Sequence, residues 1–111
     1  HGDGAFGYTI MELETAARHR IPVVSLVLNN KCLLWEKWAT EEAFGGGRYV
    51  ACDFTDVRFD RIAQAAGCLG TRVSEPDGIR DAIRSALDSN KPSVIEVMVD
   101  PTETPSSLIA E

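Results

Sequence analysis

The chain has 111 residues, of which 44% are hydrophobic, and this suits one small domain with a packed core and leaves no room for a second. Its formal charge of −6 argues against a general nucleic-acid binder. Since it contains no apolar run long enough to cross a bilayer and no basic-then-apolar leader, we expect a soluble, cytoplasmic protein that binds no membrane.

The first half of the chain predicts a turn, a helix and a buried strand. The turn-like sequence Gly2-Asp3-Gly4-Ala5 leads into hydrophobic residues at helical spacing, which predict a helix over roughly 7–19. Residues 23–28 are almost all apolar without alternation, which is typical of a parallel strand covered on both faces, and we expect this strand to be central. Because no strand leads into the turn, we expect an N-terminally truncated domain that lacks its lead-in strand.

The segment 31–50 is apolar but has no clear period. Its leucines and tryptophans indicate a short helix or an apolar loop, and the triplet Gly45-Gly46-Gly47 excludes regular structure just beyond. We expect this segment to be mobile. Trp35 and Trp38 are interpreted as packing residues rather than substrate contacts.

The second half alternates helices and strands. The pattern predicts a helix near 59–66 closed by Gly67, a strand over 68–73, an amphipathic helix after Pro76, a turn at 90–92 and a strand over 94–99. This alternation predicts an α/β domain over residues 1–100, a three-layer α/β/α arrangement with a mostly parallel sheet, followed by a tail at 101–111. Three cysteines, Cys32, Cys52 and Cys68, are widely spaced and in no C-x-x-C pair, so we expect reduced, packed thiols.

Two polar positions are expected to meet at one edge of the sheet. In a right-handed strand–helix–strand unit the carboxyl ends of neighbouring parallel strands lie together, so Asp3 and Asn30 converge there. Carboxylate and amide oxygens suit Mg²⁺, which takes about six oxygens and often shares them with substrate phosphates. The free amides after Gly4, at the start of the first helix, can donate to phosphate oxygens. The sequence therefore predicts a cleft for a hard cation and a diphosphate.

Other interpretations of these residues are weaker. Residues 2–7 satisfy the G-x-G-x-x-G pattern of dinucleotide-binding turns, but Asp3 would repel a naked phosphate and no acidic residue ends the next strand to hold a ribose. An Asp-based phosphohydrolase would need further carboxylates near Asp3. A turn former and a loop cap could explain Asp3 or Asn30 taken alone.

The residues then match a family. Gly2-Asp3-Gly4-Ala5, Glu12-Leu13-x-Thr15-Ala16-Ala17-Arg18, Ile21-Pro22-Val23 and Asn29-Asn30 closely resemble the diphosphate-binding signature of thiamine diphosphate-dependent enzymes of the acetolactate synthase and benzoylformate decarboxylase type. A weaker likeness continues to Pro92-Ser93-Val94-Ile95-Glu96-Val97. Many family members have Gly where this chain has Leu34, in a region that usually sets substrate specificity.

The resemblance implies a cofactor, a metal ion and an active site shared between two domains. Thiamine diphosphate would be held with Mg²⁺, whose ligands would be the side chains of Asp3 and Asn30 and the carbonyl of Cys32. Gly2, Gly4 and Ala5 would complete the diphosphate site. The catalytic glutamate of such enzymes lies on a separate pyrimidine-binding domain, usually in the partner subunit of a dimer, so the chain would hold half a site.

Two function classes follow from this resemblance. The first is the cofactor-binding domain of a decarboxylase or carboligase acting on small 2-oxo acids, inactive as an isolated piece and homo-oligomeric at full length. The alternative is a non-catalytic domain of the same fold with an assembly or regulatory role. The presence of a pyrimidine-binding domain with its glutamate in the complete sequence would distinguish them.

Overall fold

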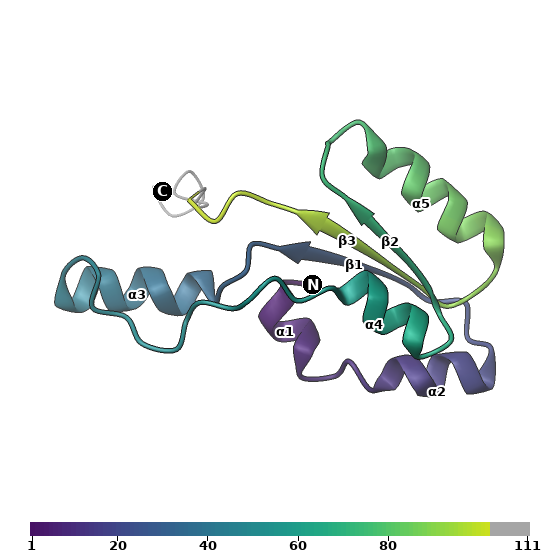
Figure 1. Cartoon of the computed structure of the whole chain (residues 1–111), viewed down its shortest axis with the longest axis horizontal. Coiled ribbons are helices and arrows are strands. Elements are labelled where there is room, and N and C mark those ends of the chain that lie inside the picture. The colour runs from purple at the N-terminus through teal and green to yellow at the C-terminus, as the bar shows by residue number, and fades with distance from the viewer. Residues whose placement is uncertain (103–111) are drawn as a thin grey trace, which may run out of the picture.

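The computed structural model describes residues 1–102 and shows a small parallel sheet with helices on both faces (Figure 1). The elements in chain order are α1 (Asp3–Gly7), α2 (Glu12–His19), β1 (Val24–Asn29), α3 (Leu34–Phe44), α4 (Phe59–Ala65), β2 (Leu69–Val73), α5 (Gly78–Ser89) and β3 (Ser93–Met98). The strand order is β1-β3-β2, and both pairings are parallel.

The central strand is β3, which corrects the expectation that the strand at residues 23–28 is central. Every residue of β3 from Ser93 to Val97 is buried, whereas β1 is only partly buried and Leu28 is exposed. On the other edge of β1, the Leu28 N–H donates to the His1 carbonyl at 2.8 Å and Gly2 pairs with Leu28 in parallel. The residues before α1 thus run beside β1, and a lead-in strand before His1 stays a prediction.

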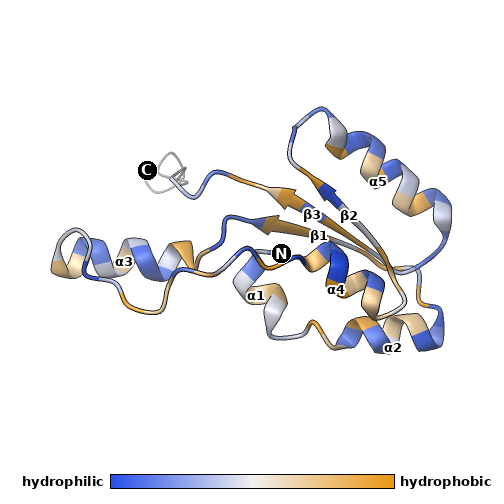
Figure 2. Cartoon of the chain, viewed as in Figure 1, coloured by the Kyte–Doolittle hydropathy of each residue, from blue (hydrophilic) through white to orange (hydrophobic). Residues whose placement is uncertain are grey.

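Two apolar clusters hold the layers together, one on each face of the sheet. Val27 and Val94 pack with α1, α2 and α4 on one face, and Ile95 and Val97 pack with α5 on the other. Side chains alternate between faces along each strand, so neighbouring residues of β3 serve different clusters. Figure 2 shows β1 and β3 as largely hydrophobic between helices of mixed character. The predicted three-layer α/β/α arrangement is confirmed.

The single helix predicted over 7–19 is two helices. The first, α1, begins at Asp3 and contains Gly4 and Gly7, although glycine disfavours a helix in isolation. Residues 8–11 form turns whose backbone hydrogen bonds span three residues, and α2 follows. The predicted apolar stripe is nevertheless correct, since Phe6 and Leu13 are buried and Ile10 packs against them.

The segment 31–50 contains a regular helix, α3, which ends at Phe44 and is followed by Gly45 as its C-cap. None of its residues is buried, and it extends away from the sheet and the other helices (Figure 1). Trp35 is 59% exposed and meets the Trp38 ring edge-on with centroids 5.5 Å apart, so its interpretation as a packing residue is wrong. The mobility of this segment stays a prediction.

The other predicted elements are confirmed with shifts of one or two residues. Gly67 follows α4 with φ of +85°, and Asn90 ends α5 in the left-handed conformation. The three cysteines are free and buried, as expected. Within residues 1–102 no helix is long and apolar enough to cross a membrane. The predicted tail lies outside the described residues from position 103 onward.

Candidate diphosphate and cation site

A cavity of about 670 Å³ opens where the carboxyl ends of β1 and β3 meet the start of α1. It contains every site residue predicted from the sequence, namely Gly2, Asp3, Gly4, Ala5, Asn30 and Cys32. The remaining lining residues are Leu28, Leu33, Leu34, Trp35, Glu36, Val99 and Asp100. The strand–helix–strand topology therefore brings the two predicted polar segments to one place.

Asp3 presents an unsatisfied carboxylate oxygen at this cavity. Its side chain is 3% exposed, and Oδ1 accepts a hydrogen bond of 2.9 Å from the Gly4 N–H. Oδ2 is buried and has no hydrogen-bond partner in the described part of the chain. Burial raises the pKa of Asp3, and the hydrogen bond from Gly4 opposes this shift. A buried oxygen without a partner is costly, and a cation would supply the missing partner.

Asn30 and Cys32 belong to one tight turn after β1. Asn30 Oδ1 accepts the Cys32 N–H at 3.1 Å, and the intervening Lys31 has a left-handed backbone with φ of 61°. The Cys32 side chain is buried, and burial raises the pKa of its thiol. Within residues 1–102 the Cys32 carbonyl accepts no backbone hydrogen bond. Its oxygen is thus available as a ligand, and its use in metal binding stays a prediction.

The start of α1 supplies two backbone N–H donors, one of which already makes a hydrogen bond. The Gly4 N–H is engaged by Asp3, whereas the Ala5 N–H makes no backbone hydrogen bond within the described residues. A β-carbon at Gly4 would overlap the Leu33 side chain and approach the Phe54 ring to 3.2 Å, while one at Gly2 would meet nothing within 4 Å. Close packing against Leu33 therefore explains glycine at position 4.

Two buried polar residues beside the cavity were missed as functional candidates. Glu96 is fully buried on β3 and bonds to Asn29, the last residue of β1. The available signal was a charged residue inside an otherwise apolar strand, because such residues are rarely buried without a specific partner. Among residues 1–102, no group of three or more His, Cys, Asp or Glu side chains is arranged to hold a metal.

The fold and cavity together define a class of protein. Residues 1–97 match the model of the family described as "Thiamine pyrophosphate enzyme, C-terminal TPP binding domain". The chain belongs to this family, so it is a thiamine diphosphate-binding domain of the enzyme class that the resemblance indicated.

Particular relatives support the assignment. The chain is 39% identical over 101 residues to the acetolactate synthase large subunit IlvG of Mycobacterium tuberculosis, covering 91% of this chain and 18% of that protein. It is 32% identical over 101 residues to oxalyl-CoA decarboxylase of Escherichia coli, covering 90% of this chain and 18% of that protein. The thiamine diphosphate-dependent 4-hydroxybenzoylformate decarboxylase of Rhodococcus jostii RHA1 superposes with a TM-score of 0.82 at 31% identity, covering 89% of this chain and 19% of that chain.

Proposed function

We propose that this chain is the diphosphate- and Mg²⁺-binding domain of a thiamine diphosphate-dependent enzyme that acts on 2-oxo acids. The observation that carries the proposal is the buried, unpartnered Oδ2 of Asp3, which lines one cavity with Asn30 and Cys32. Acetolactate synthase and 4-hydroxybenzoylformate decarboxylase among its relatives support a decarboxylation or a carboligation as the reaction.

A divalent cation resolves an electrostatic conflict in this cavity. Asp3 and a diphosphate carry charges of the same sign, and their repulsion would be strong in a partly desolvated site. The residues fit Mg²⁺, because Asp3 offers a carboxylate oxygen, Asn30 an amide oxygen and Cys32 a carbonyl. Asn30 is neutral, so the ligand set adds no second negative charge beside the diphosphate.

The start of α1 would bind the anion itself. The free Ala5 N–H is a hydrogen-bond donor at the cavity, and the positive end of the helix dipole favours negative charge there. When bound, thiamine diphosphate supplies the electron sink for cleavage or formation of a bond next to a carbonyl. The role of this chain is to bind and orient that cofactor through its diphosphate.

The rest of the active site would come from another domain. We propose that a pyrimidine-binding domain, from a partner subunit of a homodimer, encloses the other half of the cofactor and supplies the activating glutamate. The chain spans 18% to 19% of the length of the relatives named above, which leaves room in them for such a domain.

Calorimetric titration of the complete protein with thiamine diphosphate tests the proposal. We expect binding with Mg²⁺, and loss of most of the affinity after EDTA treatment or in Asp3→Ala. Ser93→Ala is a matched control, because Ser93 is equally buried and bonds to Lys91 at the opposite end of the sheet. Equal affinity with and without the cation would contradict the metal bridge.

A further inference from the structure

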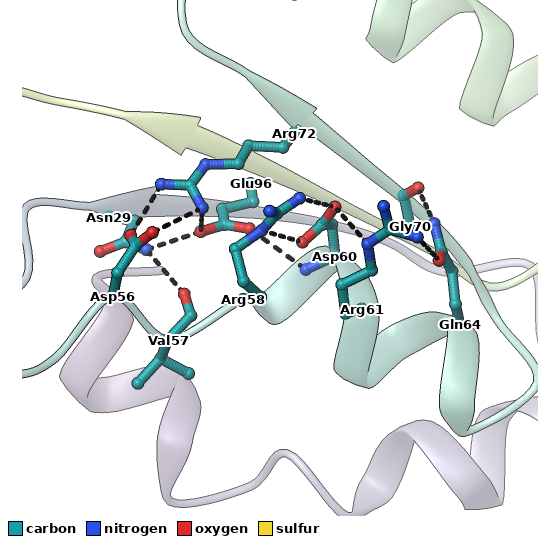
Figure 3. Close-up of polar contacts among 10 residues, drawn as sticks. All are labelled: Asn29, Asp56, Val57, Arg58, Asp60, Arg61, Gln64, Gly70, Arg72 and Glu96. Atoms are coloured by element: carbon teal, nitrogen blue, oxygen red, sulfur yellow. Dashed lines mark hydrogen bonds and ion pairs between the residues drawn. The ribbon is translucent and has the colours of Figure 1, made fainter.

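Glu96 is a buried carboxylate whose two oxygens are both engaged (Figure 3). Oε1 accepts a hydrogen bond of 2.7 Å from Asn29 Nδ2, and Oε2 accepts one of 3.2 Å from the Asp60 backbone N–H. Arg72 Nη1 lies 3.8 Å from Oε1. Burying a charge is costly even when it is paired, and an apolar side chain at such a position is often at least as stable. The carboxylate therefore needs an explanation other than stability, and the groups that it holds provide one.

The first group held by Glu96 is the side-chain amide of Asn29. Asn29 is 1% exposed, and its Nδ2 donates both to Glu96 and to the Val57 carbonyl at 3.3 Å. The NH₂ group is the only donor on the Asn29 side chain, so it is this group that faces Glu96. This leaves Asn29 Oδ1 on the other side, where it accepts the Lys31 N–H at 3.0 Å. Glu96 thus fixes which end of the amide faces the turn.

Lys31 is the middle residue of the turn that carries the proposed cation ligands. Its left-handed backbone is unfavourable for a residue with a β-carbon, so it persists only where surrounding contacts hold it. The hydrogen bond from its N–H to Asn29 is one such contact. Because Lys31 lies between Asn30 and Cys32, its conformation sets the directions of the Asn30 side chain and the Cys32 carbonyl.

A second series of contacts connects Glu96 to Lys31. Arg72 lies next to Glu96 and donates to the Asp56 carboxylate from Nη2 at 2.8 Å and from Nη1 at 3.3 Å (Figure 3). Asp56 in turn pairs with Lys31 Nζ at 3.2 Å. Lys31 is therefore held at its backbone and at its side chain, and both connections lead back to Glu96.

We infer that Glu96 is a positioning residue for the cation site. It acts through Asn29 and, more weakly, through Arg72 and Asp56, to hold the turn at Lys31 in the conformation that presents the ligands. The inference rests on the proposed function, because it concerns the same cation. It assigns a role to a residue on the central strand that does not line the cavity.

A pair of isosteric substitutions tests this link. In Glu96→Gln the new NH₂ group must face a donor, either Asn29 Nδ2 or the Asp60 N–H. In Asn29→Asp two carboxylates face each other. The double variant restores a donor–acceptor pair and the original net charge, with the hydrogen bond reversed. A structural role of this hydrogen bond predicts the same rescue of stability, so Mg²⁺ affinity of the folded variants is the measurement that separates positioning from structure.

The measurement is Mg²⁺ affinity of the complete protein at saturating thiamine diphosphate. We expect each single variant to bind Mg²⁺ about 10- to 100-fold more weakly, the usual effect of changing a residue that supports a metal ligand, and the double variant to recover much of this loss. Ser93→Ala, equally buried on β3, is expected to bind as wild type. Asp56→Asn changes only a half-exposed side chain and is expected to fold, with a loss below about fivefold.

Hydrogen exchange in the cation-free protein gives an independent measurement. The amides of Lys31 and Cys32 are bonded to the side chains of Asn29 and Asn30, so Glu96→Gln is expected to speed their exchange. If Asp3→Ala loses Mg²⁺ while Glu96→Gln binds and exchanges as Ser93→Ala does, the positioning role is overturned and the proposed function stands. If the wild-type protein binds no Mg²⁺ with the cofactor, the proposed function fails and the inference fails with it.

Discussion

Gly4 and Leu33 lie so close together that a β-carbon on Gly4 would occupy the position of the Leu33 side chain. Gly4 lies in the first turn of α1 and Leu33 precedes α3, and both line the cavity. Their contact makes the shape of the cavity depend on the packing of two segments that are distant in sequence.

Gly4→Ala is expected to weaken cofactor binding while leaving stability nearly unchanged. Alanine favours the helix by about 1 kcal/mol, whereas overpacking costs about 1–3 kcal/mol, which Leu33 can reduce by moving into the cavity. Gly7→Ala is the control, since Gly7 is in the same helix, nothing lies within 4 Å of its β-carbon, and it does not line the cavity. Binding curves beside thermal melts decide the matter, and a Gly4→Ala protein with wild-type affinity would show that the contact is unimportant.

Asp3→Asn is expected to stabilise the cation-free protein at neutral pH while weakening cation binding. Burial raises the pKa of Asp3, so the fold disfavours its ionised form and the penalty exists above that pKa. Removing the charge is expected to raise the free energy of unfolding by about 1 kcal/mol. The gain comes from the charge alone, because Asn still places one unpartnered polar atom at the position of Oδ2. Urea denaturation checks this, and the gain should shrink as pH falls and Asp3 protonates. A loss of stability at neutral pH would assign Asp3 a structural role.

The ion pairs of Asp56 are expected to stabilise the protein only above acidic pH. The Arg72 guanidinium, together with Lys31, lowers the pKa of Asp56 from 3.8 to about 2. Because the pKa of Asp56 is lower in the folded protein, its ion pairs stabilise the fold fully above the pKa of the unfolded chain, 3.8. This stabilisation is lost as pH falls from 3.8 toward about 2. The stability difference between wild type and Asp56→Asn should therefore disappear across this range and decrease with salt.

The helix α3 is expected to exchange its amide protons faster than α5, although it is nearly as long. None of the α3 residues is buried, whereas α5 packs on the sheet through Ile79, Ala82, Ile83 and Ala86. Isolated helices of this length are marginal in water, so tertiary contacts decide their protection. Hydrogen exchange of the chain alone is the measurement, and slowing of α3 in the complete protein would show that another domain covers it. Equal protection of both helices in the chain alone would contradict the expectation.

The sequence by itself determined the fold class, the family and the residues of the Gly2–Ala5 and Asn30–Cys32 segments that meet at the cavity. Periodicity reports which residues face a core, so the apolar strand at 23–28 and the amphipathic helix of α5 were predictable. The pairing of Asp3 with Asn30 followed from the right-handed connection between parallel strands, a rule that needs no coordinates.

Only the tertiary structure decided which strand is central and what the buried charge does. Strand order depends on contacts between distant segments. β1 and β3 have similar apolar patterns, but within residues 1–102 β3 lies between two strands whereas β1 has one strand and the single bridge to Gly2 beside it. The link from Glu96 to Asn29 joins residues 67 positions apart, and no local pattern encodes such a bond. Because a buried carboxylate takes its role from the donors around it, Glu96 acquired one only when folding brought Asn29, Asp60 and Arg72 to it.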